Sequence, residues 1–137
     1  MKKVIRIMAC GEKHGAPPAS ADLLIDCRGF VNPHYEEKLR PLSGASKPVQ
    51  DFLNQDEAVR EMKHAVSVMV KALLPGLLTR SSYHQEKEIL LVFKCTGGKH
   101  RSRFFALVAK AAVEELLAQT NFGEVTVVMT NRDAGKL

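Results

Sequence analysis

The apolar residues of this chain fall into two kinds of segment, short continuous runs and longer stretches with helical spacing. The continuous runs are rich in β-branched residues and are bounded by glycine, proline or polar turns, which predicts four strands: Val4–Cys10, Asp22–Cys27, Glu88–Cys95 and Glu124–Thr130. The run at 88–95 is apolar at almost every position. Such continuity is typical of a central parallel strand that is covered on both faces.

Two stretches carry apolar residues three, four and seven positions apart, the spacing of one face of an α-helix. The first predicts a helix that begins near Ser46 or Pro48 and ends at Pro75-Gly76. The second predicts a helix that begins near Ser102 and ends before Gly123. This order of elements predicts an α/β fold over residues 1–137, a single domain with a mostly parallel sheet of about four strands flanked by helices.

In such a sheet the ligand loops are expected beyond the carboxyl ends of the strands. The segments at those ends are "CGEKHG" (10–15), "DCRGFVNPHY" (26–35), "KCTGGKHRSR" (94–103) and "TNRD" (130–133). These four segments hold most of the histidine, arginine and asparagine residues that are candidates for ligand binding or catalysis. The stretch 28–48 has little periodicity, and long loops of this kind are often functional. The sequence therefore predicts one site at one edge of the sheet.

Composition narrows the class of protein. The 137 residues are 45% hydrophobic and 26% charged, which is ordinary for a globular domain. No apolar run reaches the roughly 18 residues that cross a bilayer, so we expect no membrane partner. The three cysteines, without a signal-like N-terminus, predict free thiols and a cytoplasmic protein. The formal net charge of +5 favours an anionic partner.

The loop "CTGGKHRS" has the features of a phosphate cradle. Gly97 and Gly98 let successive backbone N–H groups point to one side, and the following helix N-terminus adds positive potential. Lys99, His100 and Arg101 add side-chain donors, and a guanidinium can hold two phosphate oxygens at once. We therefore expect this loop to bind a phosphoryl group without hydrolysing the bond that holds it.

An enzyme is the alternative reading of the same loop. Cys95 and Arg101 have the Cys-x5-Arg spacing of tyrosine phosphatases, in which a thiolate attacks phosphorus and the arginine binds the oxygens. That chemistry needs a general acid, for which Asp26 and Asp133 are the candidates. Arg28 is equally compatible with anion binding and with an ion pair to a neighbouring aspartate.

Two further functions rest on weaker signals in the sequence. An RNA-binding adaptor would use phosphate contacts, because two tyrosines and no tryptophan offer little for base stacking. A zinc site from Cys10, Cys27 and Cys95 matches no known ligand spacing, so we predict no metal and no cofactor.

Four motifs in a fixed order resemble one known family. "GEKHG", "DCRGFVNPHY", "LRPLSG" and "CTGGKHRS" resemble the patterns of the C-terminal domain of the RapZ/YvcJ family. The resemblance covers nearly the whole chain. In that family a P-loop nucleotide-binding domain precedes this domain, and we expect the present chain to be a stand-alone version that lacks the P-loop domain.

The resemblance implies a binding protein, a sensor or adaptor for a phosphorylated amino sugar or a nucleotide sugar. The family's ligands are glucosamine-6-phosphate and UDP-N-acetylglucosamine, and RapZ also binds a small RNA. A regulatory protein partner and homo-oligomers are further implied. Carried over, the cradle comprises Thr96, Gly97, Gly98, Lys99, His100, Arg101 and Ser102. The rim would be Lys13 and His14, and the neighbouring wall Asp26, Arg28, Asn32, His34 and Arg40.

Overall fold

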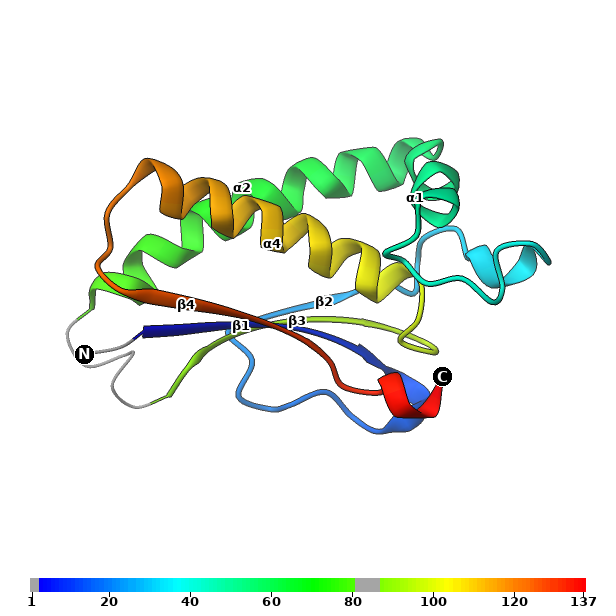
Figure 1. The fold of residues 1–137 in the computed structure, drawn as a ribbon, viewed down its shortest axis with the longest axis horizontal. Coiled ribbons are helices and arrows are strands. Elements are labelled where there is room, and N and C mark those ends of the chain that lie inside the picture. The colour runs from blue at the N-terminus through cyan, green and yellow to red at the C-terminus, as the bar shows by residue number, and fades with distance from the viewer. Residues whose placement is uncertain (1–2, 81–86) are drawn as a thin grey trace.

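The computed structural model describes residues 3–80 and 87–137. Its centre is a parallel sheet in the order β2-β3-β1-β4 (Figure 1). The strands are β1 (Lys3–Gly11), β2 (Leu23–Asp26), β3 (Ile89–Cys95) and β4 (Val125–Asn131). The predicted α/β class and the predicted sheet of about four strands are confirmed, and every strand pair is parallel.

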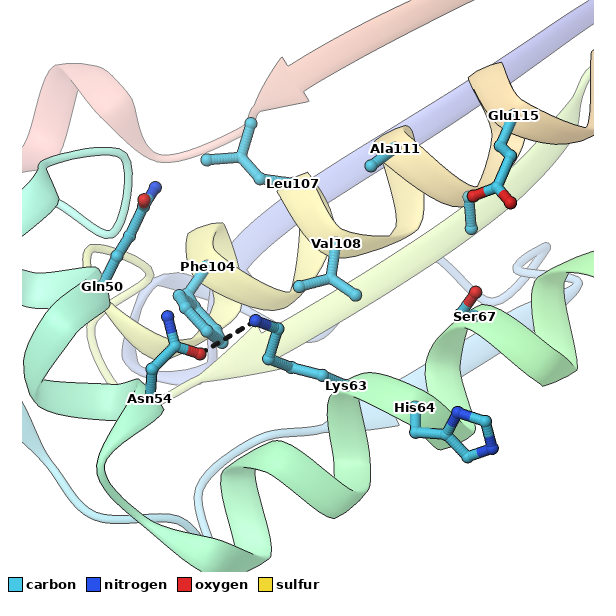
Figure 2. A pocket seen from close by; sticks show the side chains of 11 residues that line it. Gln50, Asn54, Lys63, His64, Ser67, Phe104, Leu107, Val108, Ala111 and Glu115 are labelled. Atoms are coloured by element: carbon cyan, nitrogen blue, oxygen red, sulfur yellow. Dashed lines mark hydrogen bonds between the residues drawn. The ribbon is translucent and has the colours of Figure 1, made fainter. Parts of the chain in front are cut away.

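The helices of the described residues are α1 (Lys47–Asn54), α2 (Glu57–Thr79) and α4 (Arg101–Gln119). Figure 1 shows α2 and α4 lying across the same face of the sheet. These two long helices pack on each other, and a groove remains between them on the side away from the strands (Figure 2).

The predicted start of the first helix is confirmed, because α1 begins at Lys47, but the predicted continuity of the helix and its end at Pro75-Gly76 were wrong. The stretch forms two helices, because Asp56 starts a new one: its Oδ1 accepts a hydrogen bond from Val59 N at 3.1 Å, a side-chain N-cap. At the other end α2 continues through Pro75. Proline removes one backbone hydrogen bond, but Leu74 and Leu78 on either side of it are fully buried, and their packing carries the helix to Thr79.

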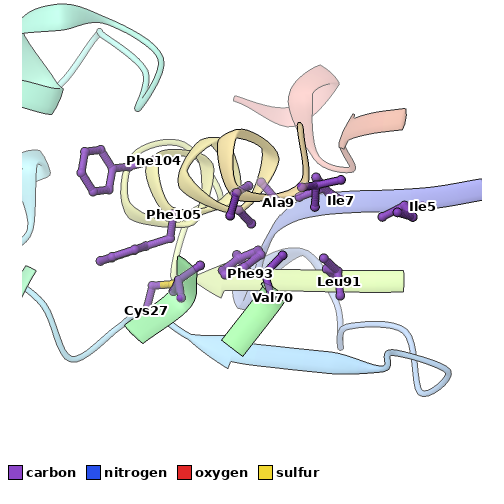
Figure 3. Packing of buried hydrophobic residues seen from close by; sticks show 14 of the residues in the cluster. Ile5, Ile7, Ala9, Cys27, Val70, Leu91, Phe93, Phe104 and Phe105 are labelled. Atoms are coloured by element: carbon purple, nitrogen blue, oxygen red, sulfur yellow. The ribbon is translucent and has the colours of Figure 1, made fainter. Parts of the chain in front are cut away.

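The core lies between the sheet and the helices. Ile5, Ile7 and Ala9 alternate along β1 toward the helices, as do Leu91 and Phe93 along β3 (Figure 3). Phe105 of α4 packs into the same cluster. Full burial of each large side chain stabilises the fold by about 1.5–3 kcal/mol, so this face fixes the register of the strands.

The opposite face of the sheet has a lighter cover. Cys10, Leu90 and Val92 form a small second cluster there, packed against Met8 and Ala21. Ala21 belongs to the segment that connects β1 to β2. β3 is thus buried on both faces as expected, but the second cover includes this connecting segment, whereas α2 and α4 lie on the other side.

The long connection after β2 is ordered. It contains a 3-10 turn, Pro33–Tyr35, which Asn32 caps by accepting a hydrogen bond from His34 N at 3.1 Å. Arg40 Nε donates to His34 O at 2.9 Å and ties the two halves of the loop together. Among the described residues no helix combines the length and apolar character needed to cross a bilayer.

Candidate functional site

The loop between β3 and α4 is built on a backbone that only glycine allows. Gly98 has a φ of +79°, and its N–H donates to Cys95 Sγ at 3.2 Å. A Cβ at Gly98 would lie 2.7 Å from Gly11 N, and a Cβ at Gly11 would lie 2.5 Å from Gly97 C. The loop is therefore pressed against the end of β1, with no room for a methyl group between the two backbones.

The "LRPLSG" segment holds the same loop from the other side. Gly44 N donates to Lys99 O at 2.9 Å, and a Cβ on Gly44 would collide with the carbonyl oxygen of His100. This contact places Arg40 beside the start of α4. Two glycines from distant parts of the chain thus fix the loop by close backbone approach.

A pocket of about 390 Å³ opens at this edge of the sheet. Nine of the residues predicted from the sequence line it: Lys13, Asn32, His34, Arg40, Thr96, Gly97, Lys99, His100 and Arg101. The remaining lining residues are Tyr35, Cys95, Lys136 and Leu137. The lining contains no aspartate or glutamate, so its charged side chains are all cationic.

Two of these cations have no partner of their own. The ammonium groups of Lys13 and Lys99 make no hydrogen bond or ion pair with any described residue. Lys13 lies over the loop, since its Cε is 4.0 Å from the position of a Cβ on Gly97. Unpaired cations gathered around one pocket produce a local positive potential that attracts anions.

Arg101 is buried; it holds the segment after β2 in place and also lines the pocket. It is 5% exposed, and its Nη1 donates to Arg28 O at 2.7 Å and to Phe30 O at 2.9 Å. One nitrogen of the guanidinium therefore anchors the segment after β2. The group still lines the pocket.

Five residues predicted for the site do not line the pocket: His14, Asp26, Arg28, Gly98 and Ser102. Asp26 and Arg28 form an ion pair at 2.7 Å, and the hydrogen bonds from Arg28 lower the pKa of Asp26 to about 2. Ser102 Oγ accepts a hydrogen bond from the Cys95 thiol at 3.2 Å. His14 is half-buried, and its Nε2 has no hydrogen-bond partner among the described residues.

His100 carries a buried nitrogen with an unused hydrogen-bonding capacity. The residue is 5% exposed and lines the pocket, yet its Nε2 has no partner among the described residues. Burial lowers the pKa of His100 below the ordinary 6.5, although the carbonyls of Leu42 and Leu39 favour the charged form. A buried polar atom without a partner is rare and marks a place where a ligand can contribute one.

We expect the ligand-free His100 to titrate with a midpoint below 6.5. Because the unfolded chain then binds more protons than the folded one as pH falls through 6.5, the free energy of unfolding falls in that range. NMR titration of the imidazole measures the midpoint, and His100→Gln should remove this part of the pH dependence. A midpoint above 6.5 would contradict the assignment.

The pocket lacks the acids that the phosphatase reading requires. Cys95 lines it, but Asp26 is paired with Arg28, and Asp133 is 2% exposed and lies outside the lining. Asp133 accepts hydrogen bonds from Gly11 N at 2.7 Å and from Arg132 Nε at 3.1 Å. Neither carboxyl group is placed to protonate a leaving group in the pocket.

Arg132 has a structural role beside the pocket that its place in the sequence did not predict. Its Nη1 donates to Ala16 O at 2.7 Å and its Nη2 to Gly15 O at 2.9 Å, so it holds the loop that carries Lys13. The signal was present, since "RD" directly follows β4 at the ligand edge. Three further residues line the pocket and were not predicted from the sequence: Tyr35, Lys136 and Leu137.

The three cysteines are unpaired and buried. Burial raises the pKa of the Cys27 thiol far above its ordinary value and also raises that of Cys10. In the described ranges no three histidine, cysteine or acidic side chains come together as metal ligands would.

Comparison with known proteins identifies the family of this chain. Residues 3–134 match the family described as the RapZ C-terminal domain. A nucleotide-binding protein of Thermobifida fusca is 34% identical over 130 residues, which are 95% of this chain and 40% of that protein. One from Shewanella halifaxensis is 32% identical over 130 residues, 95% of this chain and 42% of the relative.

The similarity also extends to shorter matches. A nucleotide-binding protein of Alkalilimnicola ehrlichii is 36% identical over 96 residues, 70% of this chain and 32% of its own length. The chain thus spans about two fifths or less of these relatives. The family match covers all four strands and the whole "CTGGKHRS" loop. This chain belongs to the RapZ C-terminal domain family.

Proposed function

We propose that the pocket binds a phosphorylated small molecule, an amino-sugar phosphate or a nucleotide sugar, and that the chain serves as a sensor or adaptor. One observation carries this proposal. The pocket gathers five cationic side chains, from Lys13, Arg40, Lys99, Arg101 and Lys136, and no acidic side chain. In a partly enclosed site such a set favours a multiply charged anion.

The phosphoryl group would lie against the loop from Thr96 to Gly97. A Cβ on Gly97 would have only the flexible Lys13 side chain near it, at 4.0 Å, so an anion can approach the backbone closely. The start of α4, a helix of 19 residues, adds positive potential. Lys13 and Lys99 supply the mobile charges, and His100 Nε2 supplies a further hydrogen bond.

The rest of the ligand would contact the loop after β2. Asn32, His34 and Arg40 offer donors and acceptors, and Tyr35 presents a ring that is 80% exposed at the pocket. An exposed aromatic ring beside polar groups suits the flat face of a sugar or a base. The relatives' name, nucleotide-binding protein, supports a ligand of this class.

Binding without turnover fits the side chains better than hydrolysis does. The acids that a Cys95 nucleophile would need lie outside the pocket, in ion pairs and backbone hydrogen bonds. The enzyme reading is therefore an outcome for the experiment to decide, and so is RNA binding.

The test is calorimetric titration with inorganic phosphate, glucosamine-6-phosphate and UDP-N-acetylglucosamine. We expect at least one of them to bind, and Lys99→Met to weaken that binding about tenfold, the loss of one charge-assisted hydrogen bond. Lys110→Met is the control, because Lys110 pairs with Glu114 on the outer surface of α4. It should leave the affinity unchanged.

Two results would contradict the proposal. The first is equal binding of glucosamine, which has no phosphate. The second is release of phosphate from an aryl phosphate by the wild type and not by Cys95→Ser, which would establish the phosphatase instead. Binding of RNA with little dependence on salt would exclude a phosphate-driven RNA contact.

A further inference from the structure

A groove of about 440 Å³ runs between α2 and α4, away from the strand ends, and α1 closes one end of it (Figure 2). Its apolar wall comes from Phe104, Val108 and Ala111 of α4. The facing wall is Lys63 and Ser67 of α2. None of these residues belongs to the pocket at the strand ends.

Lys63 lies in this groove without a carboxylate partner. Its Nζ donates to Asn54 Oδ1 at 2.9 Å and lies 5.7 Å from the centre of the Phe104 ring, as Figure 2 shows. An ammonium group has three donors, and no described residue offers it a negative charge. Glu115, the acidic residue of the lining, already pairs with Lys71 Nζ at 2.9 Å.

The margins of the groove continue the same chemistry. Arg103 lies one helical turn before Leu107, which lines the groove, and it makes no hydrogen bond or ion pair with any described residue. Apolar surface and unpaired cations therefore occur together along this surface.

The dimensions suit a helix. From Phe104 to Glu115 the wall of α4 extends eleven residues, which is about 16 Å and three helical turns. Ala111 is exposed and small, so a neighbouring backbone can come close to α4 at this point. An apolar groove with these features is a familiar receptor for one face of an amphipathic helix.

We propose that this groove binds an acidic amphipathic helix of a partner protein. Small apolar side chains of that helix would cover Val108 and Ala111 above the buried Phe104, and one carboxylate would pair with Lys63. A second copy of the chain is less suitable, because two chains of formal charge +5 repel each other. The partner is therefore defined by apolar residues on one helical face and acidic residues beside it.

A designed peptide provides the probe, a fluorescein-labelled helix of about 14 residues with leucine and alanine on one face and glutamate beside it. We expect a Kd on the order of 10–100 µM by fluorescence anisotropy. Ala111→Arg should fill the groove and weaken binding about tenfold or more. Ala118→Arg is the matched control, because Ala118 is exposed on α4 beyond the groove, and it should change the Kd by less than about twofold.

A second pair of variants tests the charge without filling the groove. Replacing the central glutamate of the peptide by glutamine should weaken binding to the wild type severalfold and should have no effect on binding to Lys63→Met. Circular dichroism confirms that each variant is folded. No anisotropy change up to about 1 mM peptide, or equal binding by Ala111→Arg, would overturn the proposal. So would a wild-type dimer that Ala111→Arg converts to monomer, since a second copy would then occupy the groove.

Discussion

Replacement of Gly98 by alanine is expected to lower the free energy of unfolding by about 3 kcal/mol. The left-handed φ of +79° costs a side chain about 1 kcal/mol, and the forced contact with the end of β1 adds about 1–3 kcal/mol. The added Cβ would meet Gly11 N at 2.7 Å and Cys10 C at 3.0 Å. Both neighbours are backbone atoms of a central strand and cannot rotate away.

The adjacent glycine is the control for this prediction. The nearest atom to a Cβ on Gly97 is Lys13 Cε at 4.0 Å, the end of a flexible side chain. Gly97→Ala should therefore unfold at nearly the same urea concentration as the wild type. Urea titration of the three proteins measures the difference, and equal stabilities of Gly97→Ala and Gly98→Ala would refute the close contact between the loop and β1.

Replacement of Asp133 by asparagine is expected to cost about 3 kcal/mol, because it leaves Arg132 without its buried counter-charge. Asp133 is 2% exposed, and its Oδ2 accepts from Gly11 N at 2.7 Å and from Arg132 Nη2 at 3.1 Å. The loop that holds Lys13 depends on this arrangement. Asp26→Asn provides the comparison: its pair with Arg28 is exposed, and such pairs contribute less than about 1 kcal/mol.

The acid dependence of stability offers an independent reading of Asp133. Burial alone would raise the pKa of Asp133, but the hydrogen bonds from Arg132 and Gly11 outweigh it and hold the pKa below the usual 3.8. The stabilisation is therefore present above pH 3.8 and is lost as pH falls through the lower folded-state pKa. Urea unfolding between pH 7 and pH 3 should show a shallower acid loss in Asp133→Asn than in the wild type. Equal slopes would exclude this role.

The strands of the sheet could be predicted because the residues of each strand alone identify it. The runs at 4–10, 88–95 and 124–130 are apolar and β-branched, and each lies within two residues of the observed strand. The helices show what local pattern omits. Because the apolar periodicity continues across Asp56, it gave no sign of the new N-cap there. Proline usually ends a helix, but the burial of Leu74 and Leu78 keeps Pro75 inside α2.

The pocket was predictable to the level of its loops and not of its side chains. Parallel strands bring their ends to one edge, and three of the four predicted segments, 10–15, 26–35 and 94–103, contribute residues to the pocket, whereas 130–133 contributes none. Which side chains face the pocket depends on contacts that no pattern records. Gly98 turns its N–H to Cys95 Sγ, and Asp26 and Arg28 pair with each other two residues apart. The role of Arg132 could not be predicted from its neighbours in the sequence, because it donates to carbonyl groups of the distant β1–β2 connection.

The continuity of α4 has a thermodynamic consequence. Arg101, in its first turn, lines the pocket at the strand ends, while Val108 and Ala111 farther along the same helix form the wall of the groove. The helix α4 would therefore contribute residues to both of the proposed binding sites. Whatever factor an anion imposes on the peptide's dissociation constant, the peptide must impose on the anion's, and titrating each in the presence of the other yields one linkage free energy from two directions.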